Sequence, residues 1–263
     1  MSLKYSIKTV LFLLSLLVTS SAWAQLELKD SVIVKGLRLA VMDDLGNTYT
    51  VAKDNTITLR KKSGLVFTFN EKSFGEVKHI DPANPMKILV HYADANQILF
   101  LDNTLSEIGR LDLNTLGVYG LNVLVGNSRL NGFWLFNPVE LNLSRYDNNG
   151  KRLSGNQLNA FIQQADQPQM IQEKNGKLYM SLGSGKTMGF DINATYLFQL
   201  QTPGIKDFRV EGEHLFYFNG EVIVVRNLET VEQKQLPLPR NLQKAKKKVV
   251  AIQCGSNRCL IAL

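Results

Sequence analysis

The segment Ile205–Leu236, IKDFRVEGEHLFYFNGEVIVVRNLETVEQKQL, carries the clearest fold signal in the sequence. Its apolar stretches combine β-branched and aromatic residues, which favour extended backbone. Gly212 and Asn219-Gly220 separate these stretches, and Asn-Gly between two apolar runs is a strong hairpin signal. The segment therefore predicts four antiparallel strands, at Asp207–Glu211, His214–Phe218, Glu221–Arg226 and Thr230–Leu236.

Similar units fill most of the chain and begin at intervals of roughly 40 residues, the period of four-stranded propeller blades. The other units are Leu37–Phe69, Val77–Leu113, one from about Gly120, and Pro168–Leu200. Lys248–Cys254 and Cys259–Leu263 supply only two strands, and Leu26–Lys35 can supply the outer strands of the same blade. We therefore predict an all-β, six-bladed β-propeller closed by strands from both chain ends. Seven blades would result if two units are merged between Leu113 and Pro168.

One segment departs from this pattern. Leu158, Phe161, Ile162 and Ala165 follow the i, i+3, i+4, i+7 spacing of one helix face. We therefore expect a short helix over Gln157–Ala165.

In unit length and strand pattern, the chain resembles six-bladed propellers of the NHL and TolB-like kind. The resemblance covers nearly all of residues 25–263. The repeated Gly-His and Trp-Asp signature of the WD40 family is absent, since the two tryptophans are Trp23 and Trp134. Asp81–Glu107 is also similar to a motif of uncharacterised secreted propeller-like proteins. These resemblances imply a fold and export, and no activity.

The first 24 residues have the layout of a secretory signal peptide. Lys4 and Lys8 precede the apolar run Val10–Val18, and Ala22-Trp23-Ala24 forms an A-x-A cleavage site. We expect cleavage before Gln25, which leaves residues 25–263 as one exported domain, periplasmic or extracellular, without a transmembrane segment. The alternative is an uncleaved membrane anchor, for which the apolar run is short.

Positive charge is concentrated near the C-terminus. Removal of the leader takes away two lysines and no acid, which lowers the net charge from +7 to +5. Arg240–Lys248 contains five basic residues and no acidic one. Such a run can bind an anionic partner or form a solvated loop, and export argues against nucleic acid. The candidate interaction residues are Trp134, Phe161, Arg240, Lys244, Lys246 and Lys247.

Two cysteines, Cys254 and Cys259, flank the turn-forming stretch Gly-Ser-Asn-Arg. A hairpin would bring them together, and an exported protein meets an oxidising compartment. We therefore predict a disulfide between them. A zinc site is not expected, because no histidine lies near the pair.

The remaining motifs indicate turns rather than chemistry. Gly183–Thr187 lacks the first glycine and the following helix of a phosphate-binding loop. Asp147-Asn148-Asn149-Gly150 lacks the spaced ligands of a calcium loop and is typical of a turn. Trp134 lies in a strand whose two faces would both be buried in a propeller, so core packing competes with a ligand contact there. We predict no cofactor or metal site, and the sequence identifies no catalytic residue.

Two functions compete on these grounds. The first is an exported, non-enzymatic propeller that binds an envelope protein or a glycan through its loops. The second is a propeller enzyme, a hydrolase or lyase acting on sugars or lactones, with a site assembled at the central channel. Convergent ionisable side chains at the channel mouth would favour the enzyme.

Overall fold

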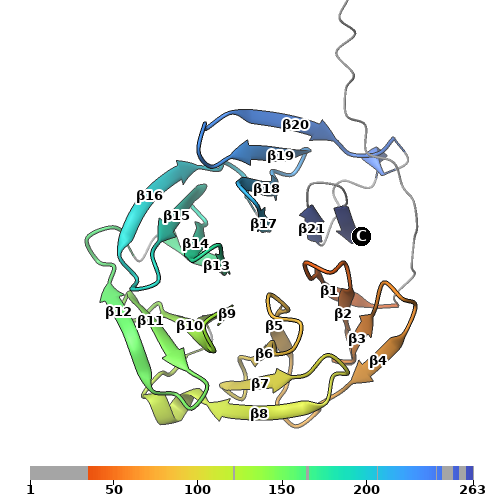
Figure 1. The fold of residues 1–263 in the computed structure, drawn as a ribbon, viewed down its shortest axis with the longest axis vertical. Coiled ribbons are helices and arrows are strands. Elements are labelled where there is room, and N and C mark those ends of the chain that lie inside the picture. Colours follow the sequence, from red (N-terminus) through yellow and green to blue (C-terminus); the bar gives the residue numbers. More distant parts are fainter. Residues whose placement is uncertain are drawn as a thin grey trace, which may run out of the picture.

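The computed structural model describes residues 35–120, 122–163, 166–205, 207–240, 242–244, 251–254 and 259–262. These residues form five four-stranded antiparallel sheets and one two-stranded sheet. Figure 1 shows the sheets arranged as blades around a central channel, with the first strand of each blade innermost and the fourth at the rim. The predicted all-β propeller fold is therefore confirmed, with five complete blades in the described part of the chain.

The blades follow the order of the chain. Blade 1 consists of β1 (Leu37–Met42), β2 (Thr48–Ala52), β3 (Ile57–Arg60) and β4 (Val66–Phe69). Blade 2 consists of β5 (Val77–Asp81), β6 (Ile88–Tyr92), β7 (Gln97–Leu101) and β8 (Glu107–Asp112), followed by the 3₁₀ helix η1 (Leu113–Leu116). Blade 3 consists of β9 (Leu124–Ser128), β10 (Gly132–Asn137), β11 (Asn142–Asp147) and β12 (Arg152–Gln157).

Two more blades and a hairpin complete the ring. Blade 4 consists of β13 (Pro168–Lys174), β14 (Lys177–Leu182), β15 (Lys186–Phe190) and β16 (Tyr196–Gln201). Blade 5 consists of β17 (Phe208–Glu211), β18 (His214–Phe218), β19 (Val222–Asn227) and β20 (Gln233–Pro237). The two-stranded sheet, β21 (Ala251–Cys254) and β22 (Cys259–Ala262), lies between blades 5 and 1.

Local turn chemistry explains why the strands begin and end where they do. In blade 5, the Asn219 side chain accepts hydrogen bonds from the amides of Glu221 and Val222, and Gly220 has φ of 97°. In blade 3, Asp147 accepts from the amides of Asn149 and Lys151 in the same way, as expected for a turn residue. These bonds stabilise the hairpins without contacts from other blades.

The apolar core lies between blades rather than at one centre. Each blade packs its two faces against its neighbours, so residues of both alternating sets are buried. Phe133 and Leu135 of β10 pack toward blade 2, whereas Trp134 and Phe136 of the same strand pack toward blade 4. Blade 3 is therefore apolar on both faces.

The ends of the chain agree with the prediction as far as they are described. Cys254 and Cys259 are directly opposite each other in β21 and β22 and form the predicted disulfide. Cys254 packs on Phe216 and Phe218 of blade 5, and Ala262 packs on Ala40 of blade 1. The outer strands predicted within Leu26–Lys35 lie outside the described residues except for Lys35, as does the predicted signal peptide. Among the described residues, no helix is long and apolar enough to cross a bilayer.

The helix predicted over Gln157–Ala165 is wrong in the part that is described. Gln157 ends β12, and a single turn follows in which the amides of Phe161 and Ile162 both donate to the Leu158 carbonyl. Leu158 and Ile162 are buried between blades 3 and 4. Their spacing thus reflects two anchor points of an interblade connection and not a helix face.

Candidate functional site: the mouth of the central channel

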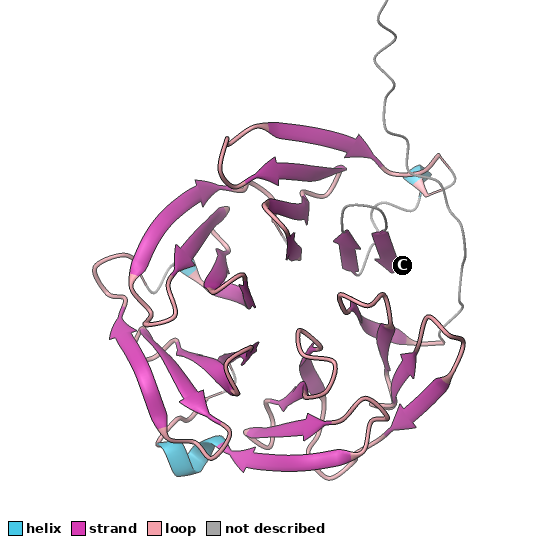
Figure 2. Ribbon diagram, in the orientation of Figure 1, coloured by secondary structure: helices cyan, strands magenta, loops and turns pink. Residues whose placement is uncertain are grey.

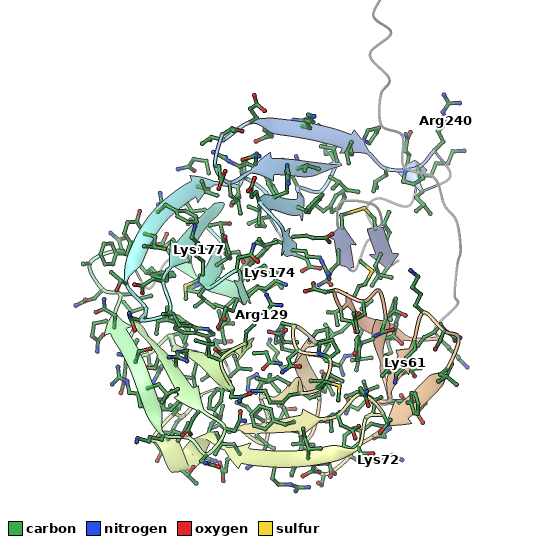
Figure 3. The ribbon with its side chains drawn as sticks, viewed as in Figure 1. Lys61, Lys72, Arg129, Lys174, Lys177 and Arg240 are labelled. Carbon is green, nitrogen blue, oxygen red and sulfur yellow. A yellow bond between two sulfur atoms is a disulfide. The ribbon has the colours of Figure 1, made fainter. Side chains whose placement is uncertain are left out.

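Ionisable side chains converge where the first strands of the blades end. They come from the ends of β1, β5, β9, β13 and β17, and line a cavity of about 30 Å³. Its charged lining residues are Asp43, Asp44, Asp81, Arg129, Glu173, Lys174 and Arg209, with His79 beside them. In Figure 3, Arg129 and Lys174 lie near the centre of the ring, whereas Lys61, Lys72 and Arg240 lie at its outside. We call this region the channel mouth.

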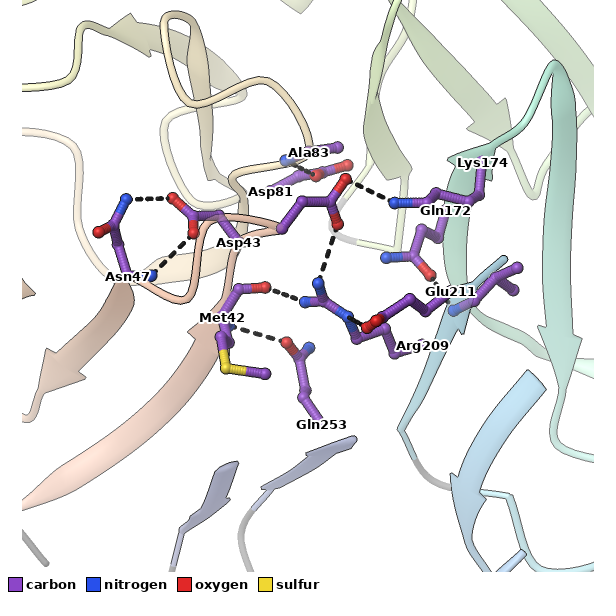
Figure 4. Close-up of polar contacts among 12 residues, drawn as sticks. Met42, Asp43, Asn47, Asp81, Ala83, Gln172, Lys174, Arg209, Glu211 and Gln253 are labelled. Atoms are coloured by element: carbon purple, nitrogen blue, oxygen red, sulfur yellow. Dashed lines mark hydrogen bonds and ion pairs between the residues drawn. The ribbon is translucent and has the colours of Figure 1, made fainter. Parts of the chain in front are cut away.

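An ion-pair cluster around Asp44 spans the channel mouth. Asp44 Oδ2 lies 2.5 Å from Lys174 Nζ of blade 4, and its Oδ1 lies 2.9 Å from Arg209 Nη2 of blade 5. Arg209 also donates from Nη1 to the Met42 carbonyl oxygen, and its Nε lies 3.7 Å from Glu211 Oε2. Figure 4 shows these contacts meeting between the blades. Blades 1 and 4 are not neighbours in the ring, so the Asp44–Lys174 pair bridges the channel itself.

A second set of contacts joins neighbouring inner strands by capping their backbone amides. Gln253 Oε1 of β21 accepts from the Met42 amide of β1 at 2.9 Å. Gln172 Oε1 of β13 accepts from the Val210 amide of β17 at 3.0 Å. Inner strands of different blades are not hydrogen-bonded in one sheet, so these side chains satisfy amides that would otherwise be buried without a partner.

Two buried carboxylates also accept hydrogen bonds from groups of a neighbouring blade. Asp81 Oδ2 accepts from the Asn127 amide of β9 at 2.7 Å, while its Oδ1 accepts from the Ala83 amide at 2.9 Å. Glu173 Oε2 accepts from Trp134 Nε1 at 2.6 Å, and its Oε1 accepts from the Arg129 amide. Both carboxylates therefore link blade 3 to a neighbouring blade.

Asp43 is held within blade 1. Its carboxylate accepts from the backbone and side-chain amides of Asn47 and from the Tyr49 hydroxyl. Burial, reinforced by this carboxylate, raises the pKa of Tyr49 well above its usual value. The Tyr49 hydroxyl is therefore a hydrogen-bond donor at neutral pH and not a base.

Burial lowers the pKa of three basic groups that lie near the channel. Burial lowers the pKa of Lys87 to about 8, and the nearby Asp81 and Glu173 carboxylates oppose that shift. Burial also lowers the pKa of His91 to about 3, with further contributions from His79 and Lys78. The pKa of His79 is lowered by burial too, against the attraction of Asp81. Both histidines are therefore neutral at physiological pH.

The size and bonding of the channel mouth limit its chemistry. A cavity of about 30 Å³ has room for about two water molecules and not for an organic substrate. Each carboxylate described above already accepts a hydrogen bond or forms an ion pair. Among the described residues, no group of three or more histidine, cysteine or acidic side chains is arranged to hold a metal ion. The arrangement therefore suits the joining of blades better than proton transfer to a substrate.

The residues predicted from the sequence for an interaction surface do not lie at this mouth. Trp134 is 0% exposed and donates to Glu173, so its assignment to a surface is wrong: a blade between two others buries both of its faces. Phe161 is 44% exposed and stacks on Tyr196 with ring centroids 4.6 Å apart. Arg240 and Lys244 are exposed, and Lys246 and Lys247 lie outside the described residues.

Strand direction separates the two groups of residues. In each four-stranded blade, the first strand begins on one face of the ring and ends on the other. The channel mouth is built from the ends of first strands. Phe161 and Arg240 lie in connections that lead from a fourth strand to the next inner strand, away from the channel mouth, and we call these connections the connection face.

Sequence reasoning missed the residues of the channel mouth. Asp44, Lys174 and Arg209 lie up to 165 positions apart, and no local motif joins them. A signal was present, since the first strand of each unit ends at or next to a charged residue. Alignment of the units by their first strands would have shown that recurrence.

Comparisons with known proteins support the fold. No protein-family profile matches the chain, and no curated protein matches it in sequence. A streptogramin B lyase structure is 14% identical over 91% of this chain and 93% of its own, with a TM-score of 0.59. A catalytically inactive virginiamycin B lyase from Staphylococcus aureus with quinupristin is 14% identical over 89% and 80%, with a TM-score of 0.58. The Neurospora crassa Pan2 WD40 domain is 10% identical over 76% and 65%, with a TM-score of 0.52. At these identities the likeness shows the β-propeller fold alone.

Proposed function

We propose that this chain is an exported, non-enzymatic β-propeller that binds another protein of the cell envelope. The observation that supports this proposal most directly is the network of ion pairs and hydrogen bonds at the channel mouth. There, Asp44 forms ion pairs with Lys174 and Arg209 across the channel, and the remaining cavity is about 30 Å³. A propeller with its channel closed in this way still offers two rigid faces for a partner.

The connection face is the binding surface in this proposal. Phe161 and the Arg240 segment belong to connections of the same kind, and both carry exposed side chains. An exposed aromatic ring on one connection and basic side chains on another suit a partner with an acidic, partly apolar surface that spans several blades. A glycan is the other partner class that suits this composition.

Export and ring closure belong to the same proposal. The Cys254–Cys259 disulfide is typical of an oxidising compartment. We infer cleavage before Gln25 and a sixth blade in which Leu26–Lys35 adds outer strands to β21 and β22. N-terminal sequencing of the exported protein should begin at Gln25. Deletion of 26–35 should lower the midpoint of urea unfolding.

An enzyme acting at the channel is the second candidate, and two observations favour it. Ionisable side chains do converge at the channel mouth, and two structural neighbours are lyases by name. In this hypothesis the Asp44 cluster would have to open to admit a sugar or lactone. Asp81 and Glu173 would then be the available carboxylates.

Affinity capture from envelope extracts distinguishes the two candidates. The bait is the exported protein, compared with a connection-face variant (Phe161→Ser, Arg240→Glu, Lys244→Glu) and a channel variant (Glu173→Gln). We expect one partner to be retained by the wild type and by the channel variant, and lost by the connection-face variant. The proposal would be overturned if the wild type turned over a sugar polymer or cyclic lactone and Glu173→Gln did not. It would also be overturned if the connection-face variant captured the partner as well as the wild type does.

A further inference from the structure

A larger cleft lies away from the channel, at the rim between blades 2 and 3. Its volume is about 500 Å³, within the range of about 300–1,000 Å³ typical of small-ligand sites. One wall is η1 and the residues that follow it, from Thr115 to Val118, and the other is formed by β10, β11 and β12. Figure 2 shows the η1 helix in cyan at this outer corner of the ring. We call it the rim cleft.

The rim cleft lies where the apolar packing between blades 2 and 3 ends, after Leu135 of β10. Over most of their contact the two blades meet through apolar side chains such as Phe100, Phe133 and Leu135. Two residues beyond Leu135, on the same face of β10, stands Asn137. Asn137 does not continue the apolar packing, so a gap opens between the two blades at this point.

Three amide side chains line one wall in a single row. Asn137 is directly opposite Asn142, and Asn142 is directly opposite Gln157, so the row crosses β10, β11 and β12. In blade 5, the row that starts at the last residue of the second strand is apolar, with Phe218, Ile223 and Leu236. Each primary amide both donates and accepts hydrogen bonds. In blade 3, Asn137 Oδ1 accepts from the Val139 amide and Asn142 Oδ1 accepts from the Ser144 hydroxyl. The row therefore offers a ligand mainly the NH2 donors of these two residues, together with the Gln157 amide.

An arginine lies beside this row in a defined place. A Cβ atom added to Gly155 would lie 2.5 Å from Arg152 Nη2 and 2.9 Å from its Nε. Arg152 is exposed, and its guanidinium lies across the glycine on the sheet. Within the described part of the chain, no carboxylate forms an ion pair with Arg152, and Glu140 lines the cleft separately.

From this chemistry we infer that the rim cleft binds a neutral saccharide of one or two sugar units. One cation and one anion leave the lining without net charge, which disfavours an ionic ligand. A guanidinium group and a carboxylate can each form hydrogen bonds to two neighbouring hydroxyl groups. The side-chain amides of the row can donate further hydrogen bonds to sugar hydroxyl groups. Leu116, which is partly exposed, provides an apolar contact for the sugar ring. This inference rests on the proposed function, because it assigns a ligand to a protein that we propose acts by binding.

The test is isothermal titration of the exported protein with cellobiose, maltose and N,N′-diacetylchitobiose, with glucuronic acid as an anionic comparison. We expect at least one neutral disaccharide to bind, with an affinity that is unchanged between about 50 mM and about 500 mM salt. Arg152→Gln and Asn142→Ala should each weaken that binding ~10-fold, because each removes hydrogen bonds to the ligand.

Two further variants separate the site from general effects on the fold. Lys151→Gln removes the same charge one residue earlier and should leave the affinity unchanged. Gly155→Ala should weaken binding by displacing the Arg152 guanidinium, although it removes no polar group. Thermal unfolding of each variant confirms that the propeller is intact.

Three results would overturn the inference: no binding of any neutral disaccharide, binding unaffected by Arg152→Gln and Asn142→Ala, or binding of glucuronic acid alone with strong salt dependence. None of them bears on capture of a protein by the connection face. The two proposals therefore fail separately.

Discussion

His91 should make the fold sensitive to mild acid. It lies on β6, is 1% exposed, and is directly opposite His79 of β5. Burial lowers its folded-state pKa to about 3, whereas an unfolded histidine has a pKa of about 6.5. The unfolded chain therefore binds a proton more tightly than the folded protein does. The stability that neutral His91 provides is present above about pH 6.5 and is lost as the pH falls toward about 3.

The size of the effect follows from the difference between the two pKa values. At about pH 5, the unfolded imidazole is about 1.5 units below its pKa, which lowers the free energy of unfolding by about 2 kcal/mol. At about pH 7.5, the same contribution is about 0.1 kcal/mol. Any folded-state pKa below about 4 gives nearly the same result, so the expected difference depends chiefly on burial.

Urea unfolding of the wild type and of His91→Gln at both pH values measures this effect. Trp134 is the one tryptophan in 25–263 and is fully buried, so its fluorescence reports unfolding. Between the two pH values, the wild type should lose about 2 kcal/mol more than the variant, which cannot gain this proton. Titration of the carboxylates affects both proteins and cancels in the comparison. Equal losses in the two proteins would refute the reasoning.

Other variants test how the ring is held together. Arg209→Met should lower the free energy of unfolding by about 1–3 kcal/mol, because it removes the donor to the buried Met42 carbonyl oxygen, while Asp44, 40% exposed, keeps its pair with Lys174; a loss below about 0.5 kcal/mol in urea would contradict this. Glu173→Gln should cost about 1–3 kcal/mol, because an amide accepts only through one oxygen where the carboxylate uses two; the check is the unfolding midpoint at neutral pH. Reduction of Cys254–Cys259 should cost about 2 kcal/mol for so short a loop, and a thermal scan with and without reductant measures it.

The interblade contacts explain why charged residues at a propeller channel need not indicate catalysis. The inner strands of neighbouring blades share no hydrogen-bond ladder, so their amides need side-chain partners. Asp81 and Gln172 meet that need by accepting from backbone amides of the next blade. Buried acids of this kind have a structural reason to be present, and this weakens the inference from convergent charge to enzyme.

Local sequence signals predicted the strands closely. The strand predicted at His214–Phe218 matches the structure residue for residue, and those predicted at Asp207–Glu211 and Glu221–Arg226 match to within one residue at each end, because alternation and turn chemistry act over a few positions. The strand Leu124–Ser128 was not singled out, since Gly126, Asn127 and Ser128 have weak strand preference. Packing between blades imposes extended backbone there.

Residues close in the sequence determined the strands, the turns, the roughly 40-residue repeat and the disulfide, since each depends on neighbours a few positions away. The tertiary structure alone decided which side chains meet. Asp44 and Lys174 are separated by 130 positions and come together because the ring places blades 1 and 4 across one channel. It also decided that Trp134 is buried, because only the completed ring covers both faces of a blade. Strand formation is local, whereas burial and charge pairing depend on how the blades close into a ring.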